Sequence, residues 1–310
     1  MATAAEVKQL RDMTGAGMMD CKKALDATNG NMDEAVEFLR KKGLAASQKK
    51  AGRIAAEGAC VAFEAADGKR AAIVEINSET DFVARNEKFL DYANAVAKQA
   101  AESDAADLDA FFKETWALDP QFNVEQQLSQ MISVIGENMH IRRFERYTTE
   151  TGYVHTYIHT AGRVGVIVEL ETSVINDQVK ECAHAVALQI AALKPKYLDE
   201  NSIPEDYKKH EEEIALEQIK NDPKMANKPE NILANIIKGK LKAEFKEICL
   251  VDQPFVKDDK QSVGQYVQSV AKAVGSPIAI KRFERYETGE GLEKKSENFA
   301  EEVAKQMGAQ

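Results

Sequence analysis

The chain lacks the long apolar runs, paired cysteines and excess of basic residues that mark several common protein classes. No run of about 18 apolar residues occurs, so we expect no transmembrane helix. The first ten residues contain no apolar stretch like that of a signal peptide. None of the four cysteines forms a C-x-x-C pair, so neither a zinc ribbon nor a thioredoxin-type site is expected. These absences predict a cytoplasmic protein with reduced thiols and no membrane partner.

Basic residues are fewer than acidic ones. The 310 residues include 41 Lys and Arg against 51 Asp and Glu, which gives a net charge of -10. Proteins that hold nucleic acid mainly through their surface need a basic face, so direct nucleic-acid binding is not expected as the main activity. Apolar residues make up 44% and charged residues 30%, which is ordinary for a globular protein. The length allows two or more domains.

No enzyme motif stands out in the sequence. The chain has no phosphate-cradling G-x-x-x-x-G-K-[ST], no G-x-S-x-G and no H-E-x-x-H. His155 and His159 are four residues apart, but their Tyr, Val and Ile neighbours predict a strand. In a strand the two imidazoles would lie on one face about 13 Å apart, too far to chelate one ion. We therefore expect no catalytic residues, cofactor or metal, and a surface that binds instead of a pocket that reacts.

The first 43 residues are predicted to form three short helices, over 4–13, 20–27 and 31–43. Asn31 is predicted to cap the third helix and Gly43 to end it. The stretch 40–53 contains six basic residues and no acidic residue. This stretch is either a solvated connector or an electrostatic contact to an acidic partner.

The second half of the chain repeats the plan of the first. An Asp-Gly turn between two β-prone runs predicts a hairpin. A-I-V-E-I at 72–76 returns as V-I-V-E-L at 166–170, an offset of 94. R-R-F-E-R-Y at 142–147 returns as K-R-F-E-R-Y at 281–286, an offset of 139. The difference, 139 − 94 = 45, is the size of an insertion in the second copy. The predicted elements of the first copy are strands over 59–65, 70–76 and 139–147 and helices over 87–101 and 124–135.

The insertion is assigned to Lys196–Lys246, which is charged and helical in pattern, with Pro223 and Pro229 bracketing a turn. A projecting two-helix hairpin is predicted, with an apolar stripe that packs on a partner or on a second copy of itself. Ser296 is predicted to cap a final helix to about Met307, which either docks on a partner or packs back on the core. The fold class is therefore α+β. The predicted domains are a three-helix module with a basic linker (1–54), two core subdomains (55–148, and 149–195 with 247–287), the hairpin (196–246) and a C-terminal module (288–310).

Two short segments are candidates for exposed binding residues. Asp81 and Phe82 lie in the polar loop after the hairpin, where Phe82 is either an exposed anchor or tucked under the next helix. The second copy reads Thr172-Ser173-Val174-Ile175 at this place, without Asp-Phe, which favours a role specific to the first copy. The turn at 15–17 precedes the consecutive Met18 and Met19, which are either a soft binding surface or both partly buried.

Both segments resemble signatures of a known family. Residues 14–25, T-G-A-G-M-M-D-C-K-K-A-L, closely resemble the N-terminal signature of the elongation factor Ts family. Residues 79–86, E-T-D-F-V-A-R-N, resemble its second signature. Further matches follow in the family's order: G-E-N at 136–138 with I-R-R at 141–143, His159 with G-R-V-G at 162–165, and G-E-G at 289–291.

The resemblance implies a fold and an activity. The fold would have an N-terminal module like a ubiquitin-associated three-helix domain, two related core subdomains, a helical hairpin that dimerises some members, and a C-terminal module that touches the partner. The activity would be guanine-nucleotide exchange on elongation factor Tu, without covalent chemistry. Two other classes stay open: an adaptor with a ubiquitin-associated-like module but no exchange activity, and a metabolic enzyme with an unrecognised site.

The resemblance also implies roles for individual residues. Thr80, Asp81, Phe82 and Val83 would enter beside the partner's nucleotide site and help dislodge its Mg²⁺. The N-terminal contacts to the partner's GTPase domain would map onto Arg11, Met18 and Met19. His159 would contact another partner domain, although Thr160 and Ala161 separate it from Gly162, a spacing that varies in the family.

Overall fold

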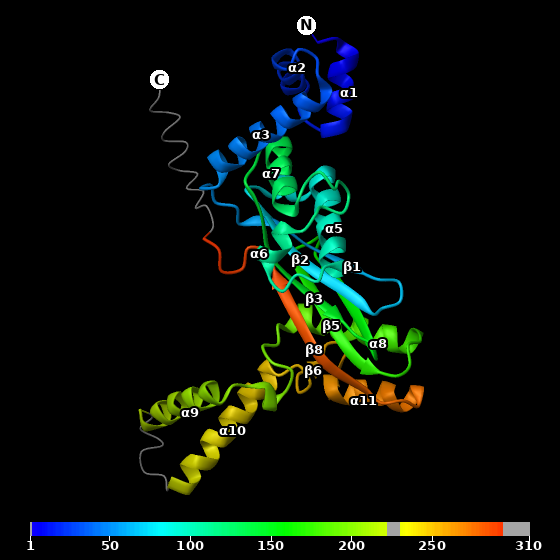
Figure 1. Ribbon diagram of the computed structural model, residues 1–310. Coiled ribbons are helices and arrows are strands. Elements are labelled where there is room, and N and C mark those ends of the chain that lie inside the picture. Colours follow the sequence, from blue (N-terminus) through cyan, green and yellow to red (C-terminus); the bar gives the residue numbers. More distant parts are fainter. Residues whose placement is uncertain (1, 222–229, 294–310) are drawn as a thin grey trace.

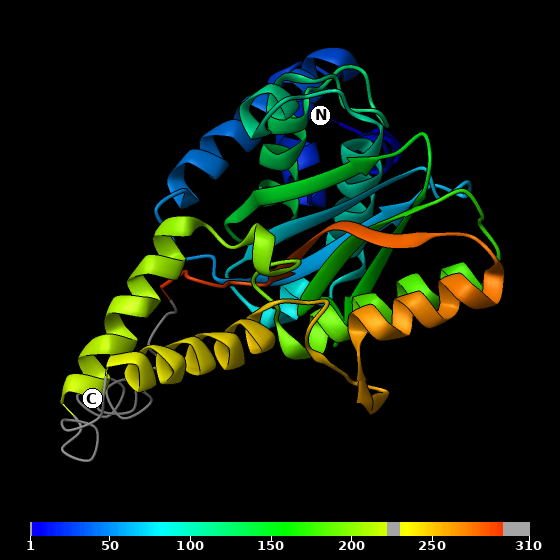
Figure 2. The same cartoon turned by 90° about the horizontal axis from the view of Figure 1, so that it is seen from below.

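The computed structural model describes residues 2–221 and 230–293 of the chain. The fold is α+β, as predicted, with two antiparallel three-stranded sheets at its centre. Figures 1 and 2 show three N-terminal helices at one end, helices on the outer side of each sheet, and a two-helix hairpin that projects from the other end. Within the described residues, no helix combines the length and the apolar character needed to cross a bilayer.

The N-terminal helices are α1 (Ala4–Thr14), α2 (Met18–Ala27) and α3 (Met32–Lys50). Asn31 caps α3 as predicted, because its side chain accepts a hydrogen bond from the Glu34 amide. The prediction that Gly43 ends this helix is wrong. Gly43 lies against the neighbouring helix α7 (Val124–Ile135), where an added Cβ would come within 2.7 Å of Gln130 Oε1. Gly43 thus lies inside α3, where it faces α7, and most of the basic stretch 40–53 is helical.

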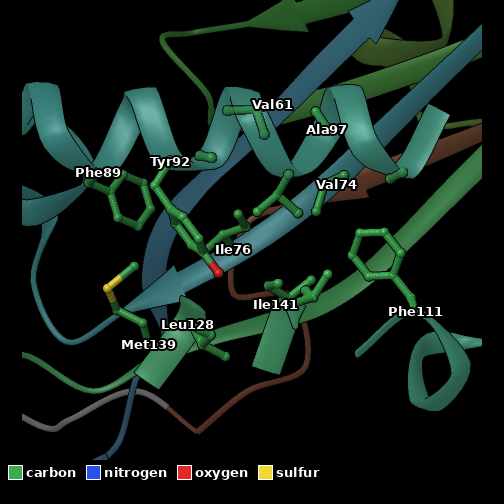
Figure 3. Close-up of a cluster of buried hydrophobic side chains, with 14 of the residues drawn as sticks. Val61, Val74, Ile76, Phe89, Tyr92, Ala97, Phe111, Leu128, Met139 and Ile141 are labelled. Atoms are coloured by element: carbon green, nitrogen blue, oxygen red, sulfur yellow. The ribbon is translucent and has the colours of Figure 1, made fainter. Parts of the chain in front are cut away.

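The first copy has the sheet order β1-β2-β3, with strands β1 (Glu57–Glu64), β2 (Arg70–Ser78) and β3 (Met139–Thr148). Its helices are α4 (Asp81–Ala84), α5 (Glu87–Glu102), α6 (Leu108–Lys113) and α7. Figure 3 shows the core that α5 and its neighbours form on one side of this sheet, where Phe89 and Tyr92 pack over Ile76 and Met139. The short α4 and α6 were not predicted.

The second copy has the sheet order β4-β5-β8, with strands β4 (Tyr153–His159), β5 (Val164–Thr172) and β8 (Ile278–Glu287). Helices α8 (Asp177–Leu193) and α11 (Val263–Val274) cover its outer side. The elements between them in the chain are the 3₁₀ turn η1 (Glu200–Ser202), the hairpin helices α9 (Glu205–Lys220) and α10 (Glu230–Ile248), and the short strands β6 (Pro254–Phe255) and β7 (Asp258–Ser262).

Strand register confirms the internal duplication. Glu75 of β2 faces Arg143 of β3, and Glu169 of β5 faces Arg282 of β8. The register shifts directly after each glutamate, so both copies contain the same β-bulge. These positions are related by the offsets of 94 and 139 found in the sequence.

The two sheets pack face to face through a cluster that both copies share. Ile73, Val154 and Ile167 lie in this cluster, whereas Val74 points to the helices on the other side. Successive strand residues point to opposite faces, so β2 is buried on both faces. This explains why its sequence is an almost unbroken apolar run instead of an alternating one.

Each buried glutamate is held by two basic residues, of which one arginine also reaches a tyrosine of the other copy. Glu75 accepts hydrogen bonds from Arg142 and Arg143, at 2.9 and 2.6 Å, and from the Gly289 amide at 2.8 Å. The Arg143 guanidinium lies 4.1 Å from the ring centre of Tyr286, in the second copy. Reciprocally, Arg282 lies 4.0 Å from the ring centre of Tyr147, in the first copy. We call this pair of contacts the arginine–tyrosine exchange.

The hairpin buries part of its apolar stripe between its own helices, at Ala215, Ile219 and Ile237. Its second helix ends two residues beyond the predicted limit of the insertion, at Ile248. The predicted turn prolines, Pro223 and Pro229, and the predicted final helix from Ser296 lie outside the described residues.

Candidate functional site

The segment Thr80–Val83 forms the start of the one-turn helix α4, between the end of β2 and the start of α5. Thr80 caps this helix, because its Oγ1 accepts a hydrogen bond from the Val83 amide at 3.4 Å. Val83 packs against the core of the first copy. Phe82, about 100° away around the helix, is 83% exposed, more than any other large apolar side chain of the described residues. The alternative that Phe82 is tucked under the next helix is therefore wrong.

Between β5 and α8, a connection whose residues are all described, the second copy has no segment equivalent to α4. Eight residues, 79–86, connect β2 to α5, whereas only four, 173–176, connect β5 to α8. The strand register places Thr172 opposite Ile278, just as Ser78 lies opposite Met139, so Thr172 corresponds to Ser78. Thr172–Ile175 is therefore not the counterpart of the Asp-Phe segment, which corrects the prediction. The connection in the second copy is four residues shorter, and no helix like α4 lies between β5 and α8.

A hollow of about 890 Å³ lies beside Phe82. Three segments line it: Arg53 and Ile54 from the linker after α3, the α4 segment, and Arg163 from the turn between β4 and β5. Ile54 is 45% exposed and adds a second apolar side chain to this hollow. An apolar centre within a charged rim is typical of surfaces that bind other proteins. Ile54 could not be identified from the sequence, where its only signal is that it is an apolar residue next to a basic stretch.

The turn between α1 and α2 exposes the two consecutive methionines. Gly15 ends α1 in the left-handed region, at a φ of 65°, and the chain then re-enters a helix at Met18. Met18 is 54% exposed and Met19 is 63% exposed, so the alternative that both are partly buried is wrong. Arg11 is also exposed, on α1. None of these three residues lines the hollow beside Phe82, so the structure does not bring the two candidate segments into one pocket.

His159 ends strand β4 and is exposed. Its Nδ1 lies 2.9 Å from the Tyr157 hydroxyl. Thr160, Ala161 and Gly162 follow with positive φ values, which form a tight turn that leads to Arg163 at the hollow. The turn connects His159 to the surface beside Phe82 along the chain.

The strand predicted around the histidine pair is confirmed, and His155 has other partners. His155 Nδ1 lies 2.9 Å from Glu64 Oε2, and its Nε2 lies 3.2 Å from His184 Nδ1. Burial acts to raise the pKa of Glu64, but hydrogen bonds from His155, Tyr153 and the Thr156 amide outweigh it, so the pKa is lowered. Burial lowers the pKa of His184. In the described part of the chain, no group of three or more His, Cys, Asp and Glu residues could hold a metal ion.

An exposed aromatic ring on a fixed helix, beside a hollow with a charged rim, is typical of the class of proteins that act by docking on another protein. Comparison with known proteins identifies the family to which the chain belongs. The family model for elongation factor Ts matches residues 79–290. The chain therefore belongs to the elongation factor Ts family, a family of translation elongation factors.

Individual relatives match almost the whole chain. The elongation factor Ts of Clostridium novyi (strain NT) is 47% identical over 307 residues, which are 99% of each chain. That of Clostridium perfringens (strain SM101 / Type A) is 48% identical over 308 residues, 99% of this chain and 100% of the relative. That of Halothermothrix orenii is 44% identical over 302 residues, 97% of each chain. The N-terminal signature at 14–25 lies outside the matched family model, but these alignments are long enough to include it.

Proposed function

We propose that this chain binds elongation factor Tu in its GDP-bound and nucleotide-free forms and accelerates GDP release, so that GTP can replace GDP. The observation that supports this proposal best is the exposure of Phe82 on a capped helix, in a chain of the elongation factor Ts family. The chain would act in the cytoplasm as a regulatory binding protein, without covalent chemistry and without a cofactor of its own.

The physical basis of exchange is a difference in affinity between two states of the partner. A GTPase holds GDP tightly because Mg²⁺ and a phosphate-binding loop neutralise the phosphates. A factor that prefers the partner conformation with weak nucleotide affinity weakens GDP binding, and by linkage GTP then weakens binding of the factor. Phe82 inserts between partner helices in this mechanism. Thr80, Asp81 and Val83 hold the inserted helix beside the nucleotide, and the shifted partner groups lose Mg²⁺, which leaves the phosphate charge uncompensated.

Two further surfaces extend the contact in this proposal. Arg11, Met18 and Met19 bind the GTPase domain of the partner, where the methionines supply adaptable apolar area. His159 contacts another partner domain. These contacts determine affinity, whereas the α4 segment acts on the nucleotide site.

The direct test is a nucleotide-release measurement. Elongation factor Tu is loaded with a fluorescent GDP and mixed with an excess of unlabelled GDP, with and without the chain. Acceleration of release that depends on the concentration of the chain supports exchange activity. Binding to elongation factor Tu without acceleration would favour the adaptor.

Replacing Met19 by alanine is expected to weaken association with elongation factor Tu by about tenfold. The change removes part of an exposed thioether side chain, and burial of such a side chain contributes about 1.5 to 3 kcal/mol. Isothermal titration calorimetry on the nucleotide-free partner measures the change. Val256→Ala, which shortens an exposed apolar side chain in the turn between β6 and β7, serves as the control. Equal affinities of the Met19 variant and the unmodified chain would remove α2 from the contact surface.

We also propose that the hairpin α9–α10 can join two copies of the chain. Its position away from the sheets leaves both helices accessible to a second molecule (Figure 2). Sedimentation equilibrium over a wide concentration range tests this, and a monomer at every concentration would contradict it.

A further inference from the structure

Two carboxylates join the loop that begins α4 to the loop that follows α7. Glu137, which follows the C-terminal cap of α7, accepts hydrogen bonds from the Thr80 amide at 3.0 Å and from the Thr80 hydroxyl at 2.7 Å. In the reverse direction, Glu79 accepts a hydrogen bond from the Asn138 amide at 2.6 Å. Glu79 and Thr80, which are neighbours in one loop, are thus paired with Asn138 and Glu137, which are neighbours in the other loop. We call these four residues the carboxylate clasp.

The clasp also holds the linker that borders the hollow beside Phe82. Arg53 lies 3.4 Å from Glu79, and the Arg53 carbonyl accepts a hydrogen bond from Asn138 Nδ2 at 2.8 Å. The Thr80 hydroxyl that donates to Glu137 also caps α4. The same hydrogen bonds therefore determine where α4 starts and where one wall of the hollow lies.

In the second copy, the two corresponding loops are joined without carboxylates. The offsets of 94 and 139 relate Glu79 to Ser173 and Glu137 to Ser276. The two serine hydroxyl oxygens lie 2.9 Å apart and share one hydrogen bond. One pair of serines is sufficient to join these two loops in the second copy, so joining the loops does not by itself require the clasp. The two carboxylates are present in the copy that carries the longer connection and the exposed phenylalanine.

We propose that Glu79 and Glu137 are positioning residues that hold α4 in the orientation in which Phe82 engages a partner. A one-turn helix is too short to be stable by itself. Fixing it before binding removes the ordering entropy that a mobile loop would lose on association. The effect on nucleotide release rests on the proposed function, whereas the effect on the order of α4 does not.

Hydrogen exchange tests the order of α4 without any partner. In Glu79→Ala/Glu137→Ala, the amides of Val83 and Arg85, which donate to the Thr80 hydroxyl and the Phe82 carbonyl, are expected to exchange at least tenfold faster than in the unmodified chain, while the central amides of α5 keep their rates. Ser173→Ala/Ser276→Ala is the matched control in the second copy and leaves the α4 rates unchanged. Unchanged exchange of α4 in the clasp variant would overturn the proposal.

A double-mutant comparison then tests positioning through Phe82. The clasp variant is expected to lower the acceleration of GDP release by about tenfold. Phe82→Ala is expected to reduce acceleration at least tenfold in the unmodified chain but less than threefold in the clasp variant, because Phe82 is no longer presented there. An equal Phe82→Ala effect in both backgrounds would overturn the positioning role.

The conservative variant separates charge from geometry. Glu137→Gln keeps one oxygen that accepts from the Thr80 amide, and it is expected to retain acceleration within threefold of the unmodified chain. Loss as large as in Glu137→Ala would contradict positioning by these hydrogen bonds. If the unmodified chain does not accelerate GDP release, the proposed function fails, and the hydrogen-exchange result alone decides whether the clasp orders α4.

Discussion

Replacing Phe82 by alanine is expected to slow the stimulated release of GDP from elongation factor Tu by roughly 10- to 150-fold. The side chain is 83% exposed in the free protein, so its removal leaves no cavity in the core. Burial of a phenylalanine side chain in a partner contributes about 1.5 to 3 kcal/mol. Each 1.36 kcal/mol changes a rate about tenfold, so the loss falls in the stated range if burial occurs only in the state that releases GDP.

Stopped-flow fluorescence with labelled GDP measures this effect at saturating and at limiting concentrations of the chain. A loss at saturation means that Phe82 acts on the nucleotide site, whereas a loss only at limiting concentration means that it contributes to affinity alone. Val256→Ala again serves as the control for removal of an exposed apolar side chain. Thermal unfolding of the Phe82 variant is expected to match that of the unmodified chain. Unchanged release rates in a folded variant would refute insertion of Phe82.

Replacing Glu75 by alanine is expected to lower the free energy of unfolding by about 3 to 5 kcal/mol, the range for breaking a buried ion pair by removing one partner. The side chain is fully buried and accepts hydrogen bonds from Arg142, Arg143 and the Gly289 amide. Its loss leaves two guanidinium groups without their shared carboxylate. Chemical denaturation at pH 7 measures the change. Glu171→Ala, an exposed glutamate on β5, is the control and is expected to change stability by less than about 0.5 kcal/mol.

The Glu75 contribution has a defined pH dependence. Burial acts to raise the pKa of Glu75, but hydrogen bonds from Gly289, Asn77, Arg142 and Arg143 outweigh it, and the pKa falls below 4.5. A lowered pKa in the folded state stabilises the protein above pH 4.5, and this contribution is lost as the pH falls through the folded-state value. The difference in stability between the unmodified chain and Glu75→Ala should therefore shrink below pH 4.5. A constant difference across that range would contradict the ionised pairing.

Much of the fold could be predicted because its determinants are local or repeated in the sequence. Helix α7 runs from Val124 to Ile135, as its apolar spacing predicts. The offsets of 94 and 139 predict that the second half repeats the first, and the strand register and the bulge are the same in both copies. Gly43 misled the prediction because a glycine that ends a helix and one inside a helix look alike in a sequence, and only the structure shows that α3 continues to Lys50.

The residues of the candidate site could be selected from the sequence, but the contacts that hold them in place could not be predicted. Asp81 and Phe82 could be identified as an unusual pair in a polar loop and through the family resemblance. Their exposure depends on Val83, which takes the core-facing position of α4. The clasp could not be predicted, because Glu79 and Glu137 are far apart in the sequence and resemble ordinary surface acids until the two loops are placed side by side.

The arginine–tyrosine exchange has the form of an isologous contact, the kind found across the two-fold axis of a homodimer. Arg143 reaches Tyr286 just as Arg282 reaches Tyr147. An ancestral polypeptide with a single copy would therefore be able to assemble the same central interface from two identical molecules. Fusion of two such genes removes the need for symmetry while the interface is retained. One half could then lengthen a loop at its edge, where α4 lies in the present molecule. The other half could accept an insertion, which is the hairpin α9–α10 in the present molecule.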